Sequence, residues 1–308
     1  RVVVTGKNSP QWAVAYLAAL YAGGIVVPVD YQLSREETIR LIRAVEAPVL
    51  FADAEKHDLF EQANCGIREK ASLARGKPNY VLELRGRGEP RKDWPGENDT
   101  AAILFTSGTT GTAKGVCLSH ANLVADTILS QDHIAVKPTD VFYALLPVHH
   151  SYTMTAVFLE SLANGCEVVF GTKMVSKQIL EDLKRGKVNM FLGVPMLFNR
   201  LLNGLKKGIR EKGIVLYGVI RFLMGVSGLS KRVFKANPGK KMFGFILKKV
   251  SLDKIRICIS GGGPLPSSTF RQFNQLGINF VQGYGLTETS PIVALNPVEH
   301  YKPASVGK

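Results

Sequence analysis

The segment Leu104–Gly115, LFTSGTTGTAKG, joins an apolar strand to a loop of hydroxyl side chains, glycines and one lysine. Glycines allow successive backbone N–H groups to converge on an anion, and the Ser and Thr hydroxyls add further donors. Lys114 supplies a positive charge at the end of the loop. The segment therefore predicts a polyphosphate-binding loop between a buried strand and a second apolar strand, Val116–Leu118.

This loop differs from a Walker P-loop, because Lys114 follows Ala113 instead of Gly and Gly115 stands where that motif has Ser or Thr. A flexible Ser/Thr/Gly linker is the alternative interpretation, although linkers do not usually separate two apolar strands. The candidate phosphate-binding residues are Thr106, Ser107, Gly108, Thr109, Thr110, Gly111 and Lys114.

Strand and helix signals alternate before this loop. Arg1–Thr5 is a β-branched run, and Ser9-Pro10 is a typical start for the helix that should follow it. Ile25–Asp30 is a second strand, and Ser34 with Glu37 forms a capping box at the start of a second helix. This alternation predicts an α/β fold with a mostly parallel sheet flanked by helices.

A second series of the same kind begins near residue 140, so we expect two α/β lobes. The predicted domains are residues 1–138 with the phosphate-binding loop, 139–297 as the second lobe, and 298–308 as the start of a β subdomain that is cut short. Residues 63–99, rich in Gly, Pro and charge, are expected to form a loose connection in the first lobe.

Two more stretches follow predicted strands of the second lobe. Ser260–Pro266, SGGGPLP, has a glycine cluster that a flat ring could approach, although a plain turn explains it equally well. Gln282–Thr289, QGYGLTET, places an aromatic ring, a hydroxyl and a carboxylate within five residues. A carboxylate oxygen is a ligand that Mg²⁺ prefers, whereas the bland alternative for Glu288 is an exposed loop residue. Leu146–His150, LPVHH, ends a further strand with two histidines, which are structural more often than catalytic.

Taken in order along nearly the whole chain, these stretches resemble the adenylate-forming superfamily of acyl-CoA synthetases, luciferases and peptide-synthetase adenylation domains. The sequence departs from the family at Ala113, where a proline is usual. The resemblance implies the two-lobed N-terminal domain of the acetyl-CoA synthetase-like fold, without the C-terminal domain that carries the adenylation lysine. It also implies that the second lobe, residues 139–297, contains the acyl and adenine site. The first residue is Arg1, so we also expect the natural chain to begin earlier.

The resemblance also assigns roles to single residues. Thr287 would contact the α-phosphate, Glu288 would bind Mg²⁺, and His150 would lie beside the substrate carboxylate, with His149 a weaker candidate. The residues implied in holding the nucleotide are Gly261, Gly262, Gly263, Pro264, Tyr284 and Gly285.

The implied activity is AMP-forming activation of a fatty acid, most like the long-chain members. ATP with Mg²⁺ would give an acyl-adenylate and pyrophosphate, and CoA as cosubstrate would then give acyl-CoA and AMP. Two alternatives stay open. One is another adenylate-forming reaction, such as loading a carrier protein or oxidising a luciferin, and the other is a basic membrane-binding module without catalysis.

The net charge of +14 is concentrated in residues 203–256, where 14 Lys or Arg face two acidic residues and give a local balance of +12. This segment resembles the insertion of long-chain members. It lacks the motifs of nucleic-acid binders, and its apolar stretches favour peripheral contact with an anionic membrane, with a solvated basic face as the alternative. The apolar run Ile214–Leu229 has 16 residues and contains Arg221, so we expect no spanning helix. Four isolated cysteines predict free thiols in a reducing compartment, and therefore a cytoplasmic protein. The basic segment adds the expectation that the protein is peripheral at the inner face of a membrane.

Overall fold

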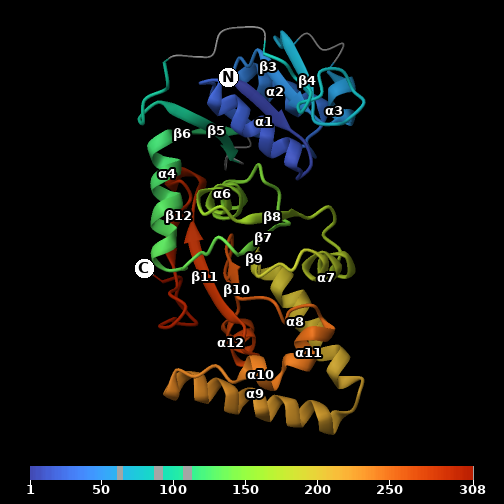
Figure 1. The fold of residues 1–308 in the computed structure, drawn as a ribbon, viewed down its shortest axis with the longest axis vertical. Coiled ribbons are helices and arrows are strands. Elements are labelled where there is room, and N and C mark those ends of the chain that lie inside the picture. Colours follow the sequence, from blue (N-terminus) through green and yellow to red (C-terminus); the bar gives the residue numbers. More distant parts are fainter. Residues whose placement is uncertain (61–64, 87–92, 107–112, 308) are drawn as a thin grey trace. The chain divides into compact units, whose positions relative to one another are not determined.

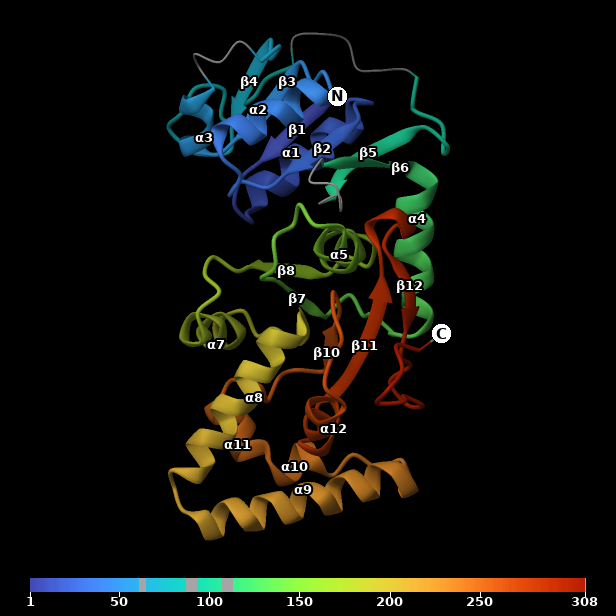
Figure 2. The same cartoon turned by 180° about the vertical axis from the view of Figure 1, so that it is seen from behind.

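The computed structural model describes residues 1–60, 65–86, 93–106 and 113–307, and it places them in two compact units (Figures 1 and 2). The first unit comprises Arg1–Asp126 and Pro147–Thr155, and the second comprises Thr127–Leu146 and Ala156–Lys308. Each unit contains a six-stranded sheet. The predicted fold class, two mostly parallel sheets flanked by helices, is therefore confirmed.

The sheet of the first unit has the order β4-β3-β1-β2-β5-β6. Neighbouring strands are parallel except β5 and β6, which form an antiparallel pair. Its strands are β1 (Val2–Thr5), β2 (Val26–Val29), β3 (Val49–Ala52), β4 (Glu69–Ser72), β5 (Thr100–Thr106) and β6 (Lys114–Ser119). Its helices are α1 (Pro10–Tyr21), α2 (Arg35–Ala44) and α3 (Ala54–Leu59), and α4 (His120–Leu129) continues into the second unit.

Local capping explains where the first two helices begin. The Ser9 hydroxyl accepts a hydrogen bond from the Trp12 backbone N–H at 3.1 Å, and Pro10 occupies the first turn. At α2 the capping box of Ser34 and Glu37 is complete in both directions. Both predicted starts are confirmed. The expected loose connection at 63–99 is wrong in one place, because the polar segment Glu69–Ser72 forms the edge strand β4 beside β3.

The sheet of the second unit has the order β12-β11-β10-β9-β7-β8 and is parallel except for the pair β11 and β12. Its strands are β7 (Val141–Ala144), β8 (Glu167–Phe170), β9 (Met190–Gly193), β10 (Ile257–Ser260), β11 (Asn279–Gly285) and β12 (Ile292–Leu295). Its principal helices are α6 (Glu160–Ala163), α7 (Ser176–Arg185), α8 (Pro195–Arg210), α9 (Ile214–Phe234), α10 (Gly239–Met242), α11 (Gly244–Lys249) and α12 (Ser267–Gln275). Short segments are η1 (Ser130–Asp132), α5 (Ser151–Thr153), the π-helix η2 (Met154–Leu159) and η3 (Thr287–Thr289).

An aromatic cluster forms the centre of the second unit. Phe198 of α8 meets Phe280 of β11 edge-on with ring centroids 4.7 Å apart, and Phe273 of α12 lies 4.8 Å from the same ring. Fully buried aromatic rings contribute the largest apolar areas of a core. The cluster fixes α8 and α12 against the sheet, and therefore fixes the strand ends that carry the candidate site.

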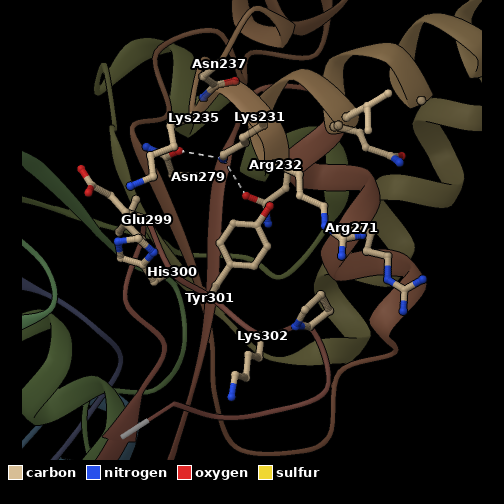
Figure 3. A pocket seen from close by; sticks show the side chains of 17 residues that line it. Lys231, Arg232, Lys235, Asn237, Arg271, Asn279, Glu299, His300, Tyr301 and Lys302 are labelled. Carbon is tan, nitrogen blue, oxygen red and sulfur yellow. Dashed lines mark hydrogen bonds between the residues drawn. The ribbon is translucent and has the colours of Figure 1, made fainter.

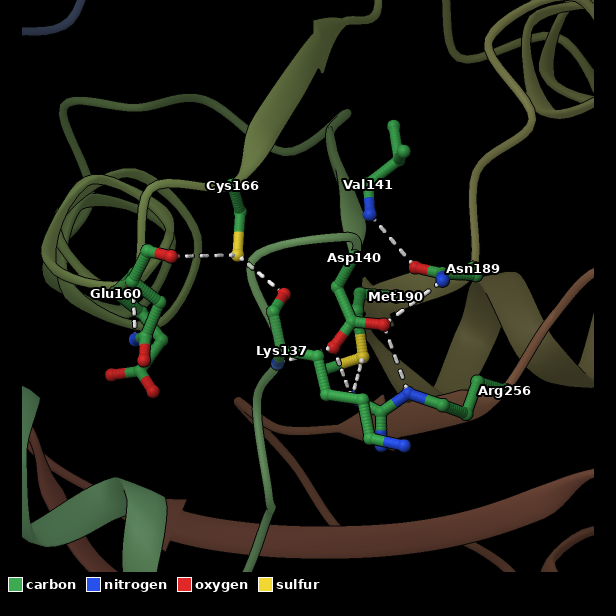
Figure 4. Close-up of polar contacts among 9 residues, drawn as sticks. Lys137, Asp140, Val141, Glu160, Cys166, Asn189, Met190 and Arg256 are labelled. Atoms are coloured by element: carbon green, nitrogen blue, oxygen red, sulfur yellow. Dashed lines mark hydrogen bonds and ion pairs between the residues drawn. The ribbon is translucent and has the colours of Figure 1, made fainter.

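A buried ion pair joins three strands at the opposite, amino-terminal end of this sheet (Figure 4). Asp140, only 1% exposed, accepts hydrogen bonds from Arg256 Nε at 3.0 Å, from Arg256 Nη2 and from Asn189 Nδ2 at 2.9 Å. The Lys137 backbone N–H donates to the second carboxylate oxygen at 2.8 Å, and Asn189 Oδ1 accepts from Val141 N–H. Each oxygen of the buried carboxylate is therefore satisfied, as burial of a charge requires.

The helix α9 is longer than the 16-residue apolar run that the sequence indicates. It has 21 residues, Ile214–Phe234, and by length and composition alone it could cross a bilayer. Within the second unit it lies alongside α8, α10 and α12 (Figures 1 and 2). Ile220, Met224 and Ser227 are buried on that side, which is the arrangement of a helix resting on the surface of a domain.

Candidate active site

The predicted phosphate-binding loop connects the antiparallel strands β5 and β6 of the first unit. Thr106 pairs with Lys114, so the two ends of the loop are adjacent. Thr106 is half-buried and Lys114 is exposed, while Ala113 packs against the core of this unit. Ser107, Gly108, Thr109, Thr110 and Gly111 lie outside the described residues, and their role stays a prediction.

The histidine pair follows β7 but belongs to the first unit. The Val148 backbone N–H donates to Asn8 Oδ1 at 3.0 Å, which ties the segment Pro147–Thr155 to the loop after β1. His149 is buried and His150 is exposed, with ring centroids 4.3 Å apart. The two adjacent histidines are therefore not equivalent, since the ring of His150 is accessible to a ligand and the buried ring of His149 packs beside it.

Burial controls the charge of both rings. It lowers the pKa of His149 from 6.5 to about 4, with the neighbouring His150 adding to the effect and Asp30 opposing it. Partial desolvation by the surrounding protein also lowers the pKa of the exposed His150, again opposed by Asp30. His149 Nε2 lies 3.7 Å from Asp30 Oδ1, which is beyond hydrogen-bond distance. A lowered pKa favours the uncharged form of both imidazoles at neutral pH, and a neutral exposed ring can donate a hydrogen bond without adding positive charge.

In the second unit, the turn Gly261–Pro264 leaves the carboxyl end of β10. The Gly261 backbone N–H donates to Gly193 O at 3.1 Å, and Gly262 has φ +73°, which favours glycine. A Cβ added at Gly263 would meet only Pro195 at an ordinary 3.7 Å. Packing therefore does not explain the absence of a side chain at Gly263. Gly262 and Gly263 are exposed, and they leave a bare backbone surface that suits a flat ring.

The second candidate stretch is strand rather than loop for its first half. β11 continues to Gly285 and pairs with β12, so the expectation that the motif follows the strand is wrong for Gly283, Tyr284 and Gly285. Tyr284 is 49% exposed although it lies in a strand. A Cβ on Gly285 would lie 1.9 Å from Pro291 O, so the close approach of two backbone segments requires this glycine.

The end of this motif is a fixed turn. Thr287–Thr289 form the short helix η3, and Thr289 Oγ1 accepts a hydrogen bond from the Leu286 backbone N–H at 3.0 Å. Thr289 Oγ1 also lies 2.8 Å from Pro291 O. Glu288 is exposed, with its carboxylate open to solvent. Among the residues that the structure describes, no group of three or more His, Cys, Asp or Glu could hold a metal, so Glu288 would need oxygens from a ligand to complete a Mg²⁺ shell.

These two motifs of the second unit lie side by side. β10 and β11 are adjacent and parallel, with Ser260 opposite Gln282, so both motifs begin at the same carboxyl edge of the sheet. Ligands of open α/β sheets bind at this edge. The family resemblance implies that Lys114 and Glu288 act on the same nucleotide, and this stays a prediction because the two residues belong to different units.

Comparison with known proteins agrees with this arrangement. The family described as AMP-binding enzyme matches residues 1–308. The chain belongs to this family.

Relatives of this AMP-binding enzyme have names that refer to long-chain fatty acids. The long-chain-fatty-acid–CoA ligase FadD15 of Mycobacterium bovis is 26% identical and aligns with 100% of this chain and 55% of its own length. A chloroplastic long-chain-fatty-acid–[acyl-carrier-protein] ligase of Arabidopsis thaliana, AEE15, is 25% identical over 95% of this chain and 49% of its own length. The chain thus spans about half the length of these two relatives.

Solved structures share the fold. ATP-bound MatB from Rhodopseudomonas palustris superposes with a TM-score of 0.75 at 26% identity, over 100% of this chain and 54% of that one. A long-chain-fatty-acid-CoA ligase from Archaeoglobus fulgidus, at 20% identity and a TM-score of 0.74, shares the fold alone.

One residue of the site in this AMP-binding enzyme had no role in the sequence interpretation. Asp30 directly follows β2, and its carboxylate is the acidic group beside the histidine pair. Its position directly after a parallel strand could have marked Asp30 as a candidate, because ligands bind at the carboxyl ends of such strands. The sequence does not predict that Asp30 lies near His149, since this proximity depends on the return of the Pro147–Thr155 segment to the first unit.

Proposed function

We propose that this AMP-binding enzyme activates a long-chain fatty acid with ATP and then transfers the acyl group to CoA. In the first step a carboxylate oxygen attacks the α-phosphorus of ATP and pyrophosphate leaves. In the second step the CoA thiolate attacks the acyl carbonyl carbon and AMP leaves. The observation that carries the proposal is the shared carboxyl edge of β10 and β11, where a bare glycine turn lies beside an exposed aromatic ring and an exposed carboxylate.

The described side chains suit the needs of the first step. The substrate carboxylate is itself the nucleophile, so the protein must position two anions in line and neutralise their charge. In this proposal Gly261–Pro264 and Tyr284 of the second unit would form the surface for adenine, and the exposed Lys114 of the first unit would supply a positive charge for phosphate oxygens. Mg²⁺ held by Glu288 would neutralise further phosphate charge. The uncharged, exposed His150 is our candidate for orienting the fatty acid carboxylate through a hydrogen bond.

The name of one relative supports a second candidate for the acceptor. The Arabidopsis relative AEE15 is named a ligase for acyl-carrier protein, whereas FadD15 is named a CoA ligase. Both reactions share the adenylation step and differ only in the thiol that attacks. A preformed acyl-adenylate should therefore be offered to the full-length protein with CoA or with phosphopantetheinylated carrier protein. Thioester formed on CoA alone supports our proposal, and thioester formed on the carrier protein alone supports the alternative.

A binding module without catalysis is the remaining rival. The test is ATP–pyrophosphate exchange by the full-length protein across fatty acids of increasing chain length, with and without Mg²⁺. We expect exchange that requires both Mg²⁺ and a fatty acid and is greatest with long chains. Absence of exchange with every acid, together with no thermal shift on adding ATP and Mg²⁺, would refute the proposed enzymatic function.

A further inference from the structure

The outward face of α9 is an unbroken apolar stripe. Its residues recur at alternating intervals of four and three, which places them on one side of a helix. Each is between 46% and 77% exposed, so this side is not part of the domain core. The stripe consists of Val215, Val219, Phe222, Val226, Leu229 and Val233. At 1.5 Å per residue it is roughly 27 Å long, far longer than a chance cluster of exposed side chains.

The helix that carries the stripe and its neighbouring helices have a positive net charge. Ile214–Phe234 contains no Asp or Glu, and its charged residues are Arg221, Lys231 and Arg232. The helices on either side add more lysines, and Phe245 of α11 is 71% exposed with Lys249 Nζ 4.3 Å from its ring centroid. An exposed apolar face on a helix with basic and no acidic residues is typical of helices that lie in the interface of an anionic membrane.

A cationic cavity of about 1060 Å³ adjoins the carboxyl-terminal half of this helix (Figure 3). It is lined by α9, α12 and residues 298–303, and Leu229 belongs both to its wall and to the stripe. Only one carboxylate, Glu299, is among its described lining residues. The cationic lining residues are Lys231, Arg232, Lys235, Arg271 and Lys302.

Lys231 lines this cavity, and hydrogen bonds fix its ammonium group. Its ammonium group donates to Asn274 Oδ1 at 2.8 Å and to Asn279 Oδ1 at 3.0 Å, and it lies 5.6 Å from the centroid of the Tyr301 ring (Figure 3). These partners fix its position without neutralising its charge. Burial lowers the pKa of Lys231 to about 8, which reflects the cost of burying an ammonium group whose hydrogen-bond partners, among the described residues, are amides and not carboxylates. An anion entering the cavity would supply that compensation.

A second copy of the chain is a poor partner for the same face. Two copies would bring two segments of +12 together, and like charge disfavours such contact. In a helix pair the positions that flank the stripe should carry complementary charges, but here they include Leu216, Gly218, Leu223 and Gly225. An anionic bilayer complements both the apolar stripe and the surrounding charge.

We propose that α9 docks in the plane of an anionic phospholipid bilayer. The stripe enters the boundary between headgroups and acyl chains, and the cationic cavity binds the phosphate of a lipid headgroup. The docking depends on the surface of the second unit alone, and it does not require the proposed reaction.

The stripe is tested by sedimentation of the full-length protein with liposomes of phosphatidylcholine, alone or mixed with phosphatidylglycerol. A stripe variant carries Val219→Gln, Phe222→Gln and Val226→Gln. A matched control replaces three exposed apolar residues elsewhere in the second unit by Leu162→Gln, Met174→Gln and Val175→Gln. We expect the stripe variant to lose at least about tenfold in partition coefficient at low and high salt, because burial of apolar area does not depend on charge. The control should bind like the parent.

The cavity is tested in the same assay. A cavity variant carries Arg232→Gln, Lys235→Gln and Lys302→Gln, and its charge-matched control carries Lys173→Gln, Lys177→Gln and Lys184→Gln. Since each basic residue near an anionic surface changes the partition coefficient roughly fivefold, we expect a loss on the order of a hundredfold with phosphatidylglycerol at low salt and little change with phosphatidylcholine. The charge control should lose much less.

Three outcomes would overturn the proposal. The parent could fail to sediment with either lipid, or the two control variants could lose as much binding as their partners. Alternatively, light scattering of lipid-free protein could show that the stripe variant converts a dimer to a monomer while liposome binding is unchanged. That last result would assign the stripe to contact between copies.

Discussion

Replacing Gly285 by alanine should displace the turn that carries Glu288. The added Cβ would lie 1.9 Å from Pro291 O and 2.8 Å from Pro291 C, whereas real Cβ contacts are essentially never below 3.0 Å. The two backbone segments must therefore separate by about 1 Å. Pro291 O accepts hydrogen bonds from the Leu286 backbone N–H at 3.1 Å and from Thr289 Oγ1 at 2.8 Å, so the same movement weakens both at a cost of roughly 2 kcal/mol.

The effect should appear in adenylation more than in folding. A displacement of about 1 Å at a catalytic group can lower the rate a hundredfold, so we expect kcat/KM for ATP–pyrophosphate exchange to fall by about that factor. The control is Gly204→Ala on α8, where an added Cβ meets nothing within 4 Å. Circular dichroism of both variants checks that secondary structure is retained. Exchange by Gly285→Ala at nearly the rate of Gly204→Ala would refute the assignment of this turn to the active site.

Three further predictions concern other parts of the molecule. Asp140→Ala should lower the free energy of unfolding by about 3–5 kcal/mol in denaturant titration, because it leaves the partly buried Arg256 guanidinium without its carboxylate. The control Glu181→Ala, in an exposed ion pair, should lower it by less than about 0.5 kcal/mol. His149 has a lower pKa in the folded state than in the unfolded state, so its contribution to stability is complete above pH 6.5 and is lost as the pH falls toward 4. Denaturant titrations between pH 7 and 4.5 should show that the free energy of unfolding falls by roughly 2 kcal/mol, and His149→Gln should remove this loss. An equal loss in the variant would contradict the role of His149. Lys114→Gln should raise the KM for ATP at least about tenfold with an unchanged unfolding midpoint, because the side chain is exposed; an unchanged KM would remove Lys114 from the site.

Features set by neighbouring residues could be predicted from the sequence. The hydroxyl of Ser9 and the box of Ser34 and Glu37 act within one helical turn, so their patterns specify the helix starts directly. The apolar strand followed by glycines also predicted the turn at Gly261–Pro264. Parallel pairing of β10 and β11 then places this turn at the carboxyl edge of the sheet.

Features that depend on distant partners could not be predicted. The burial of His149 beside Asp30 follows from a hydrogen bond between Val148 and Asn8, which are 140 positions apart. The extension of β11 through Gly285 depends on pairing with β12, which the motif itself does not encode. The length of α9 was missed for the same reason, since the core formed with α8 and α12 supports a helix that continues past the apolar run.

The central claim is that Glu288 holds the metal in an adenylation site beside the glycine turn. It is tested most directly by fatty-acid-dependent ATP–pyrophosphate exchange of the full-length protein carrying Glu288→Gln at saturating Mg²⁺, with Glu167→Gln as an exposed control in the same unit. The amide keeps the size of the side chain but removes its charge. We predict a loss of at least about a hundredfold, equivalent to roughly 2.7 kcal/mol of barrier, for Glu288→Gln and none for the control. Near-normal exchange by Glu288→Gln would contradict the claim.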